Sequence, residues 1–280
     1  MNTKTRIVFF GTPDFAVPSL EALISDSRFS VDLVVTQPDK PIGRHHSVLQ
    51  KSPIKQLAEK HAIPVHDEPL KNLVHHADCG VLVAYGKIIS QNLIDSFKHG
   101  IINVHPSLLP KYRGSSPIQA AIRNQDSETG VSIMLLDDAM DHGPILAQET
   151  VKLTKKETAG TLHDSLAKLG AGTLSDVVKQ YISGSIAPRE QNDSDATYTK
   201  KLSKSDGMLN WSDKPQSIDA HVRAMSPWPG AWTIWRNKRV LVWKSKNGLP
   251  TEVQPEGKKR MPYAEFKKGY PEFALPAHKE

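Results

Sequence analysis

The strongest constraint on the fold is the order of segments in the first two thirds of the chain, where short apolar runs alternate with stretches of helical spacing. The expected strands are residues 6–10, 31–36, 63–66, 79–84, 100–102, 131–136 and 145–153. The expected helices are residues 15–25, 52–62, 90–97, 116–123 and 161–182. Strands that alternate with helices form parallel sheets with helices on both faces. We therefore predict an α/β fold with a doubly wound, mostly parallel sheet.

The last third of the chain has a different pattern. Residues 183–204 are rich in polar residues and have few large apolar ones, which predicts a linker between a domain at residues 1–182 and a second at residues 205–280. The second domain contains an expected helix at residues 216–224 and short expected strands at residues 231–235 and 239–244. From residue 247 onwards the sequence gives little periodic signal. We expect a small β domain here.

Positive charge is concentrated in that second part. The net charge of the chain is +6. Residues 200–280 contain 16 Lys and Arg against 8 Asp and Glu, whereas the rest of the chain contains 20 against 22. All five tryptophans also lie after residue 200. A basic segment with aromatic residues suits a phosphate-rich partner such as nucleic acid, although a small domain with Trp in its core would have the same composition.

Several features indicate a cytoplasmic protein. The single cysteine, Cys79, has no partner for an internal disulfide and lies in an apolar run typical of a buried strand. No segment is apolar for long enough to span a membrane, and no signal or transit peptide is recognisable. These features fit a reducing compartment.

A candidate site follows the expected strand at residues 100–102. Asn103 and His105 are two positions apart, so an extended backbone points both side chains to one face at the carboxyl end of the strand. Open α/β sheets place their sites at that edge. Asp141 lies in a turn before Gly143-Pro144, between two expected strands, and its loop can reach the same edge.

These three residue types suit transfer of an acyl-type group to an amine. An amide and a charged imidazole can stabilise an oxyanion, and the carboxylate can hold the imidazolium and accept a proton from the amine. No serine or cysteine nucleophile is evident, which favours direct transfer over a covalent acyl-enzyme. Each residue also has a structural alternative, because an Asp in such a turn commonly bonds its own backbone.

Other chemistries are disfavoured. Gly11 is followed by Thr12-Pro13-Asp14 and no G-x-G-x-x-G is present, which argues against a nicotinamide enzyme. A phosphate-binding P-loop motif is missing as well. The adjacent histidine pairs at residues 45–46 and 75–76 lack the spacing of a zinc site, so no metal is expected.

Several separate stretches together resemble the methionyl-tRNA formyltransferase family of the folate-dependent formyltransferase superfamily. The segment from Asn103 to Gly114, N-V-H-P-S-L-L-P-K-Y-R-G, and the D-x-G-P turn at Asp141 resemble the signature of the superfamily. The stretches at residues 10–18, 228–232 and 254–261 resemble the narrower family. The resemblance runs from about residue 6 to residue 270 and implies a Rossmann-like catalytic domain followed by an OB-like domain.

The resemblance implies a function and a set of residues. The reaction would transfer a formyl group from 10-formyltetrahydrofolate to the amino group of methionine on initiator methionyl-tRNA, in translation initiation, and the protein would be a monomer. Asn103, His105 and Asp141 would be catalytic. The folate-binding residues would be Val83, Tyr85, Gly86, Ser107, Leu108, Leu109 and Pro110. The tRNA-binding residues would be Lys40, Arg44, Lys258, Lys259 and Arg260.

Three departures from the family pattern are visible. His45-His46-Ser47 stands where the family commonly has lysines, so we expect weaker electrostatic attraction to tRNA at this loop. His142 stands where the family has a small hydroxyl residue, so we expect it to influence Asp141. The interval between residues 248 and 254 is shorter than in the family, so we expect an OB-like domain that has lost strands. Two alternatives to the tRNA reaction stay open from the sequence: formylation of an amino sugar nucleotide, and RNA binding by a catalytically inactive core.

Overall fold

The computed structural model describes residues 4–42, 48–70, 73 and 75–273. Within this part the chain divides into two compact units. The first unit comprises residues 1–113, 130–150 and 164–197, and the second comprises residues 114–129, 151–163 and 198–280.

The first unit contains a seven-stranded sheet in the order β10-β9-β7-β6-β1-β2-β5. Its strands are β1 (Thr5–Gly11), β2 (Phe29–Val35), β5 (Val65–His66), β6 (Cys79–Val83), β7 (Ile101–His105), β9 (Glu128–Leu135) and β10 (Ile145–Lys152). β1 pairs in parallel with β2 and β6, β2 with β5, and β6 with β7, whereas β7 and β9 are antiparallel. The prediction of a mostly parallel sheet is confirmed.

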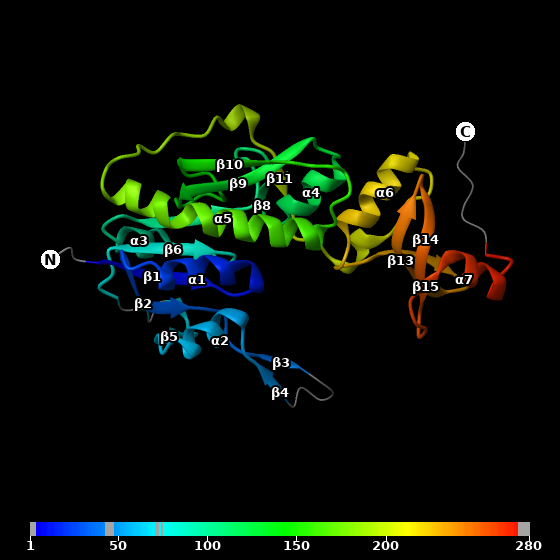
Figure 1. Ribbon diagram of the computed structural model, residues 1–280, viewed down its shortest axis with the longest axis horizontal. Coiled ribbons are helices and arrows are strands. Elements are labelled where there is room, and N and C mark those ends of the chain that lie inside the picture. The colour runs from blue at the N-terminus through cyan, green and yellow to red at the C-terminus, as the bar shows by residue number, and fades with distance from the viewer. Residues whose placement is uncertain (1–3, 43–47, 71–72, 74, 274–280) are drawn as a thin grey trace. The chain divides into compact units, whose positions relative to one another are not determined.

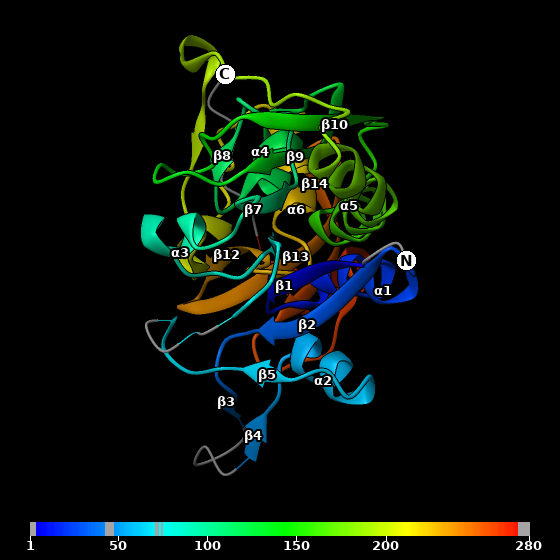
Figure 2. The ribbon, with the colours of Figure 1, turned by 90° about the vertical axis from the view of Figure 1, so that its left-hand side faces the viewer.

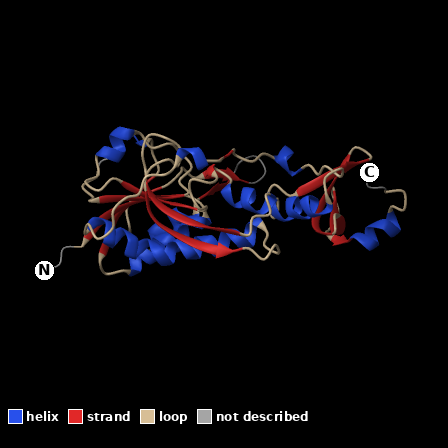
Figure 3. Ribbon diagram, turned by 90° about the horizontal axis from the view of Figure 1, so that it is seen from above, coloured by secondary structure: helices blue, strands red, loops and turns tan. Residues whose placement is uncertain are grey.

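Helices accompany the strands of this sheet (Figure 1, Figure 2). They are α1 (Val17–Ser25), α2 (Pro53–Lys60), α3 (Gln91–Asp95) and α5 (Ala159–Ile182), with a 3-10 turn at Asp14–Ala16. Ser52 begins α2, because its hydroxyl accepts from the Lys55 backbone N–H at 3.0 Å. α5 lies close to the sheet at Gly170, where a side chain would collide with Val104. The alternating strands and helices can be followed in Figure 3.

The core of this unit is centred on β1. Residues Ile7 to Phe10 are fully buried, as expected for a central strand with parallel neighbours on both sides. Phe10 makes edge contacts with Tyr85 and Phe97 at centroid distances of 5.8 and 6.1 Å. These contacts tie the loop after β6 to the central strand, so the carboxyl edge of the sheet rests on a rigid base.

The second unit contains a four-stranded antiparallel sheet in the order β12-β13-β14-β15. The strands are β12 (Ala231–Trp235), β13 (Lys238–Lys246), β14 (Leu249–Pro255) and β15 (Met261–Pro262). Its helices are α4 (Pro117–Arg123), α6 (Pro215–Ala224) and α7 (Tyr263–Gly269). Within the described residues β12 and β15 are the outer strands of this sheet, and Met208 makes an isolated parallel bridge to Trp232 of β12.

Three regions differ from the sequence expectations. Two short antiparallel strands that were not predicted, β3 (Lys40–Ile42) and β4 (Val48–Gln50), lie between β2 and α2. The segment after residue 247 forms β14, β15 and α7, where no element was predicted. α7 is held by aromatic contacts of Phe266 with Trp235 and Phe273, at centroid distances of 6.3 and 4.9 Å. Long-range packing, rather than local periodicity, stabilises this end.

The predicted linker is also structured. Residues 183–197 belong to the first unit, and Arg189 exchanges two backbone hydrogen bonds with Ile145 at the start of β10, at 2.8 and 2.9 Å. A 3-10 turn at Asp193–Asp195 follows, then the short strand β11 (Tyr198–Thr199) and a second 3-10 turn at Lys204–Gly207. The remaining short strand, β8 (Arg113–Gly114), forms the end of the 103–114 segment and pairs with β11. Polar hydrogen bonds, not apolar burial, hold residues 183–197.

Candidate active site

Asn103 is the middle residue of β7 and His105 is its last residue. The sequence predicts that the strand ends at residue 102, but it continues because Asn103 and His105 pair with Met134 and Ser132 of β9. Both side chains are almost fully buried, at 5% and 4% exposure. The two residues therefore lie on one face of the strand, at the carboxyl end that the sequence predicted.

Asp141 completes a group of three. Its Oδ1 lies 3.5 Å from the Asn103 side-chain nitrogen and 3.6 Å from Nδ1 of His105. The contacts are long for hydrogen bonds, as is common in catalytic groups before a substrate binds. The structure thus brings together the amide, the imidazole and the carboxylate, although Asn103 and Asp141 are 38 residues apart in the sequence.

The second nitrogen of His105 is also oriented. Nε2 lies 3.0 Å from the backbone carbonyl oxygen of Tyr112, which can only accept, so Nε2 carries a proton. Nδ1 faces the Asp141 carboxylate. Nε2 is therefore engaged in a hydrogen bond, whereas Nδ1 lies beside the carboxylate at a distance longer than a hydrogen bond.

The His142 side chain contacts two other carboxylates. Its Nδ1 bonds Asp137 at 2.6 Å and its Nε2 lies 3.4 Å from Asp193. The hydrogen bond that His142 donates to the Asp137 carboxylate raises the pKa of His142. The pKa of Asp193 is lowered, first by its hydrogen bond from Arg113 and also by the nearby charge of His142.

The stretch after His105 is held by Ser132 on the neighbouring strand β9. The Ser132 hydroxyl donates to the carbonyl of Ser107 at 2.7 Å and accepts from the Leu109 backbone N–H at 3.0 Å. Gln148 donates to the Leu109 carbonyl and to Ser132, both at 2.9 Å. The Ser107 hydroxyl bonds the Lys111 carbonyl at 2.6 Å. Residues 107–110 therefore have a fixed backbone, with Leu108 only partly buried beside Pro110.

The loop after β6 turns beside this stretch, because Leu82 pairs with Asn103 across the sheet. Val83 and Tyr85 are buried, whereas Gly86 is exposed, with φ of +82° and open space around it. The Tyr85 carbonyl accepts from Thr12 and Gln37 at 3.0 and 3.2 Å. The predicted folate-binding segments 83–86 and 107–110 thus leave neighbouring strands at the same sheet edge.

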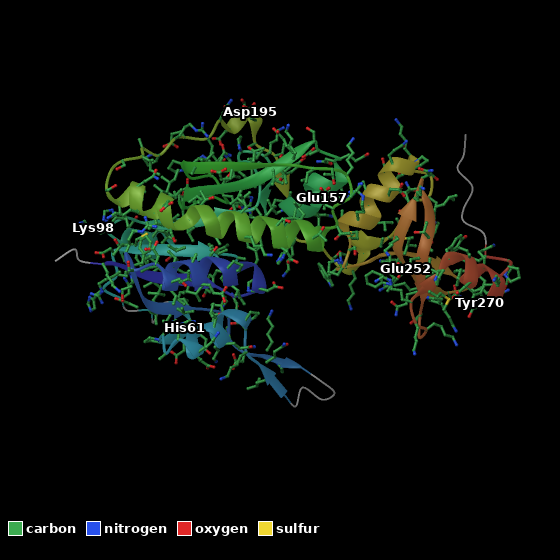
Figure 4. The ribbon with its side chains drawn as sticks, in the orientation of Figure 1. His61, Lys98, Glu157, Asp195, Glu252 and Tyr270 are labelled. Carbon is green, nitrogen blue, oxygen red and sulfur yellow. The ribbon has the colours of Figure 1, made fainter. Side chains whose placement is uncertain are left out.

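The predicted tRNA-binding residues lie in two places. Lys40 is exposed at the start of β3, and Arg44 lies outside the described residues. Lys258, Lys259 and Arg260 form an exposed turn between β14 and β15. Arg260 also pairs with Glu252 and lies over the Trp243 ring, 4.7 Å from its centroid. Figure 4 labels Glu252.

Four residues at the site were not recognised from the sequence: Arg113, Ser132, Gln148 and Gln191. Gln191 donates to the backbone carbonyls of Asp141 and Gly143 at 2.9 and 2.8 Å. Arg113, 1% exposed, donates to Gln191 and Asp193. No motif marks Gln191, which is 50 positions after Asp141 in a polar segment. Arg113 lies within the catalytic stretch, but only its burial reveals its role.

Metal and membrane features are not evident in the described residues. Residues 4–42, 48–70, 73 and 75–273 contain no group of three His, Cys, Asp or Glu side chains arranged to hold a metal ion. Over the same residues, every helix is too short or too polar to cross a membrane. Cys79 is fully buried, which raises the pKa of its thiol to about 12.

Comparisons with known proteins agree with this geometry. Residues 5–178 match the formyl transferase family, and residues 201–250 match the formyl transferase C-terminal domain. The chain is 39% identical to a methionyl-tRNA formyltransferase of Roseiflexus sp. strain RS-1, covering 94% of this chain and 92% of the relative. It is 36% identical to a methionyl-tRNA formyltransferase of Geobacter sulfurreducens, covering 95% and 94%.

A solved structure shares the fold. The sugar 3N-formyl transferase WlaRD, determined with dTDP and 5-N-formyl-THF, has a TM-score of 0.65 over 92% of this chain and 100% of that one. Its sequence identity is 19%, so this likeness shows the fold alone. The family matches and the relatives, by contrast, extend over the catalytic stretch and the C-terminal domain. The chain therefore belongs to the methionyl-tRNA formyltransferase family.

Proposed function

We propose that the protein transfers the formyl group of 10-formyltetrahydrofolate to the amino group of methionine on initiator methionyl-tRNA, in translation initiation. The observation that carries the proposal is the meeting of Asn103, His105 and Asp141 at the carboxyl edge of β7, in a chain whose near-full-length relatives are named methionyl-tRNA formyltransferases. The enzyme is a folate-dependent transferase. Amino sugar nucleotides are not favoured, because the sugar enzyme shares only the fold.

The residues at the sheet edge fit a folate. Leu108 is only partly buried, so its side chain offers apolar surface for a flat ring. Ser132 and Gln148 fix the backbone of residues 107–110, so a ligand would meet a preformed surface there. We assign folate contacts to Val83, Tyr85, Gly86, Ser107, Leu108, Leu109 and Pro110. The bound folate would supply the formyl group.

The catalytic side chains have separate tasks in this proposal. The Asn103 amide and Nδ1 of His105 donate to the formyl oxygen as negative charge develops on it, because Nε2 is bonded to the Tyr112 carbonyl and the 3.6 Å contact of Nδ1 with Asp141 is longer than a hydrogen bond. The Asp141 carboxylate lies within 3.6 Å of both, so it orients the imidazole and accepts the proton that the attacking amine loses. Burial of Asn103 and His105 strengthens these interactions, because water is excluded from the two donors.

The tRNA contacts are part of the proposal. Residues 1–182 would carry the chemistry, residues 183–204 would connect the two domains, and residues 205–280 would bind tRNA. Lys40 and Arg44 would contact the tRNA from the first domain, and Lys258, Lys259 and Arg260 from the second. The excess of basic residues after residue 200 supports this assignment. We further propose that the protein acts as a monomer in the cytoplasm.

An assay with purified protein tests the function. The protein is incubated with 10-formyltetrahydrofolate and with either methionine-charged initiator tRNA or an amino sugar nucleotide. We expect formyl-methionyl-tRNA as the product and no formylated sugar. If the sugar nucleotide alone is formylated, or if neither acceptor reacts, the proposed function is wrong. Light scattering of the same sample measures the mass in solution, where about 31 kDa is expected for a monomer.

A further inference from the structure

The turn that carries Asp141 has an unusual backbone. Asp141 has φ of +50°, in the left-handed region, and Tyr112, which bonds His105 through its carbonyl, has φ of +61°. Residues other than glycine keep this conformation where their surroundings fix it. Both catalytic contacts therefore depend on backbone that neighbouring groups must hold in place.

Those neighbouring groups include residues 189–197, which lie within the predicted linker. Gln191 donates to the carbonyls of Asp141 and Gly143, on the two sides of His142, at 2.9 and 2.8 Å. Thr197 accepts from the Tyr112 backbone N–H through its hydroxyl, and from the Arg113 backbone N–H through its carbonyl, both at 2.8 Å. Residues 191 and 197 thus hold the backbone at both positive-φ residues of the site, Tyr112 and Asp141.

Arg113 connects the two attachments. Its side chain is buried and donates to the Gln191 side-chain oxygen from Nε and Nη2, at 3.1 and 3.0 Å. Gln191 therefore makes two hydrogen bonds as an acceptor and two as a donor, so its amide orientation is defined. Since Arg113 follows Tyr112 directly, this pair links the backbone behind His105 to the backbone of Asp141.

We propose that Gln191 is a positioning residue for the catalytic carboxylate: it holds the Asp141 turn at its distance from His105, and Arg113 holds Gln191. The inference rests on the proposed function, because it assigns Gln191 a part in that reaction. Gln191 does not reach the reacting atoms in this scheme. It acts through the backbone of Asp141, so it should affect turnover more than affinity for the folate.

Arg189, in the same segment as Gln191, is attached to the proposed folate-binding stretch instead of the Asp141 turn. Arg189 donates to the Gln148 side-chain oxygen at 2.9 Å, and Gln148 donates to the Leu109 carbonyl in the proposed folate-binding stretch. Loss of this attachment should loosen residues 107–110 rather than the Asp141 turn. Arg189→Met should therefore raise KM for 10-formyltetrahydrofolate while kcat changes less.

The test uses the full chain and two replacements of Gln191. Gln191→Leu keeps the approximate size and removes all four hydrogen bonds. Gln191→Glu keeps acceptors for Arg113 but cannot donate to the two carbonyls, so this variant retains a bond that stabilises the fold. Gln180→Leu, at an exposed position of α5, is the matched control. Initial rates with charged initiator tRNA give kcat and KM, and hydrogen exchange is followed for residues 137–144.

We expect both Gln191 variants to lose turnover by a factor on the order of 10 to 100, because a displacement of about 1 Å is sufficient for such a loss. KM for the folate should stay within about threefold. Exchange at residues 137–144 should become faster, and Gln180→Leu should match the parent. Parental kcat or parental exchange in both Gln191 variants would overturn the inference. If the parent itself formylates no tRNA, the proposed function fails, and the exchange data alone decide whether Gln191 holds the turn.

Discussion

The Asp141 turn and the basic turn at residues 257–260 are both proposed to serve the same reaction, but they are built differently. The Asp141 turn is held by two hydrogen bonds from the Gln191 side chain and by the close approach of Gly143 to β9. The basic turn is exposed, and Lys258 and Lys259 extend from it into solvent. A fixed turn can place one carboxylate to within a fraction of an ångström. An exposed turn offers charge without fixed geometry.

The difference predicts how each region responds to change. At the Asp141 turn, small shifts alter turnover, since catalytic groups act over short distances. At the basic turn, the number of charges matters, because attraction to phosphate is long-ranged and weakened by salt. Substitutions at the first should change kcat regardless of salt, whereas substitutions at the second should change tRNA affinity with a strong dependence on salt.

The largest effect is expected for His105→Ala. This substitution removes a donor to the formyl oxygen, and loss of one such donor lowers kcat by about 10² to 10³. Rapid-quench measurements of formyl transfer at saturating substrates test it. His105→Gln is the companion variant, since a side-chain amide can still donate one hydrogen bond and should recover part of the loss. Turnover near the parental value in the alanine variant would remove His105 from the catalytic group.

Gly143→Ala should disturb the same turn through its backbone. A Cβ at this position would lie 2.1 Å from the Leu135 carbonyl oxygen, so the turn or the end of β9 must move. Overpacking of this kind costs about 1 to 3 kcal/mol of the free energy of unfolding, and kcat should fall with it. Urea denaturation and initial rates measure the two effects.

Gly172→Ala is the control for that substitution. Gly172 lies in the interior of α5, where a Cβ meets nothing within 4 Å. This replacement should stabilise the protein by up to about 1 kcal/mol, because alanine favours helix more than glycine does. Equal stability changes in the two variants would contradict the close approach of the turn to β9.

The basic turn is tested with Lys258→Ala/Lys259→Ala. We expect tRNA binding to weaken several-fold, and the slope of log K against log salt concentration to fall by up to about 2, one for each phosphate contact. Lys155→Ala/Lys156→Ala removes the same charge from another exposed turn and serves as the control. Filter binding over a range of salt concentrations measures both. Identical slopes in the two double variants would show that the turn contributes only general charge.

Part of the site could be predicted from the sequence. The parallel sheet follows from the spacing of apolar residues, which repeats every 2 residues in strands and every 3.6 residues in helices. The meeting of Asn103, His105 and Asp141 follows from the rule that the carboxyl ends of parallel strands lie at one edge of the sheet. Gln191 could not be found in this way. Its segment stays in place through side-chain and backbone hydrogen bonds and lacks an apolar period, so its polar composition predicted a linker.

The second unit shows the same limit. α7 has few apolar residues. It is held because Phe266 packs against Trp235, which is distant in sequence, and against Phe273, which lies just after the helix. Figure 4 labels Tyr270, which joins this aromatic group at 5.1 Å from the Trp235 centroid. Such contacts depend on tertiary structure and leave no periodic trace in the sequence.

The smallest predicted effect concerns pH and His142. Its hydrogen bond with Asp137 raises the pKa of His142 above the ordinary value of 6.5, so the folded protein binds this proton more tightly than the unfolded chain does. The resulting stabilisation is complete below about pH 6.5 and is lost as the pH rises through the higher pKa of the folded state. The gain should be below about 1 kcal/mol, because solvent screens a side chain that is 37% exposed.

His142→Asn should remove this pH dependence. An asparagine amide can still donate to Asp137 but carries no titratable proton, so the free energy of unfolding of the variant should follow a flatter curve between pH 6 and pH 9. Urea denaturation at intervals of half a pH unit measures the difference between variant and parent. The direction of this difference shows whether His142 is charged or neutral in the folded protein. If the free energy of unfolding of the parent increases relative to that of the variant as the pH rises, the His142 ring is neutral and its contact with Asp137 is not an ion pair.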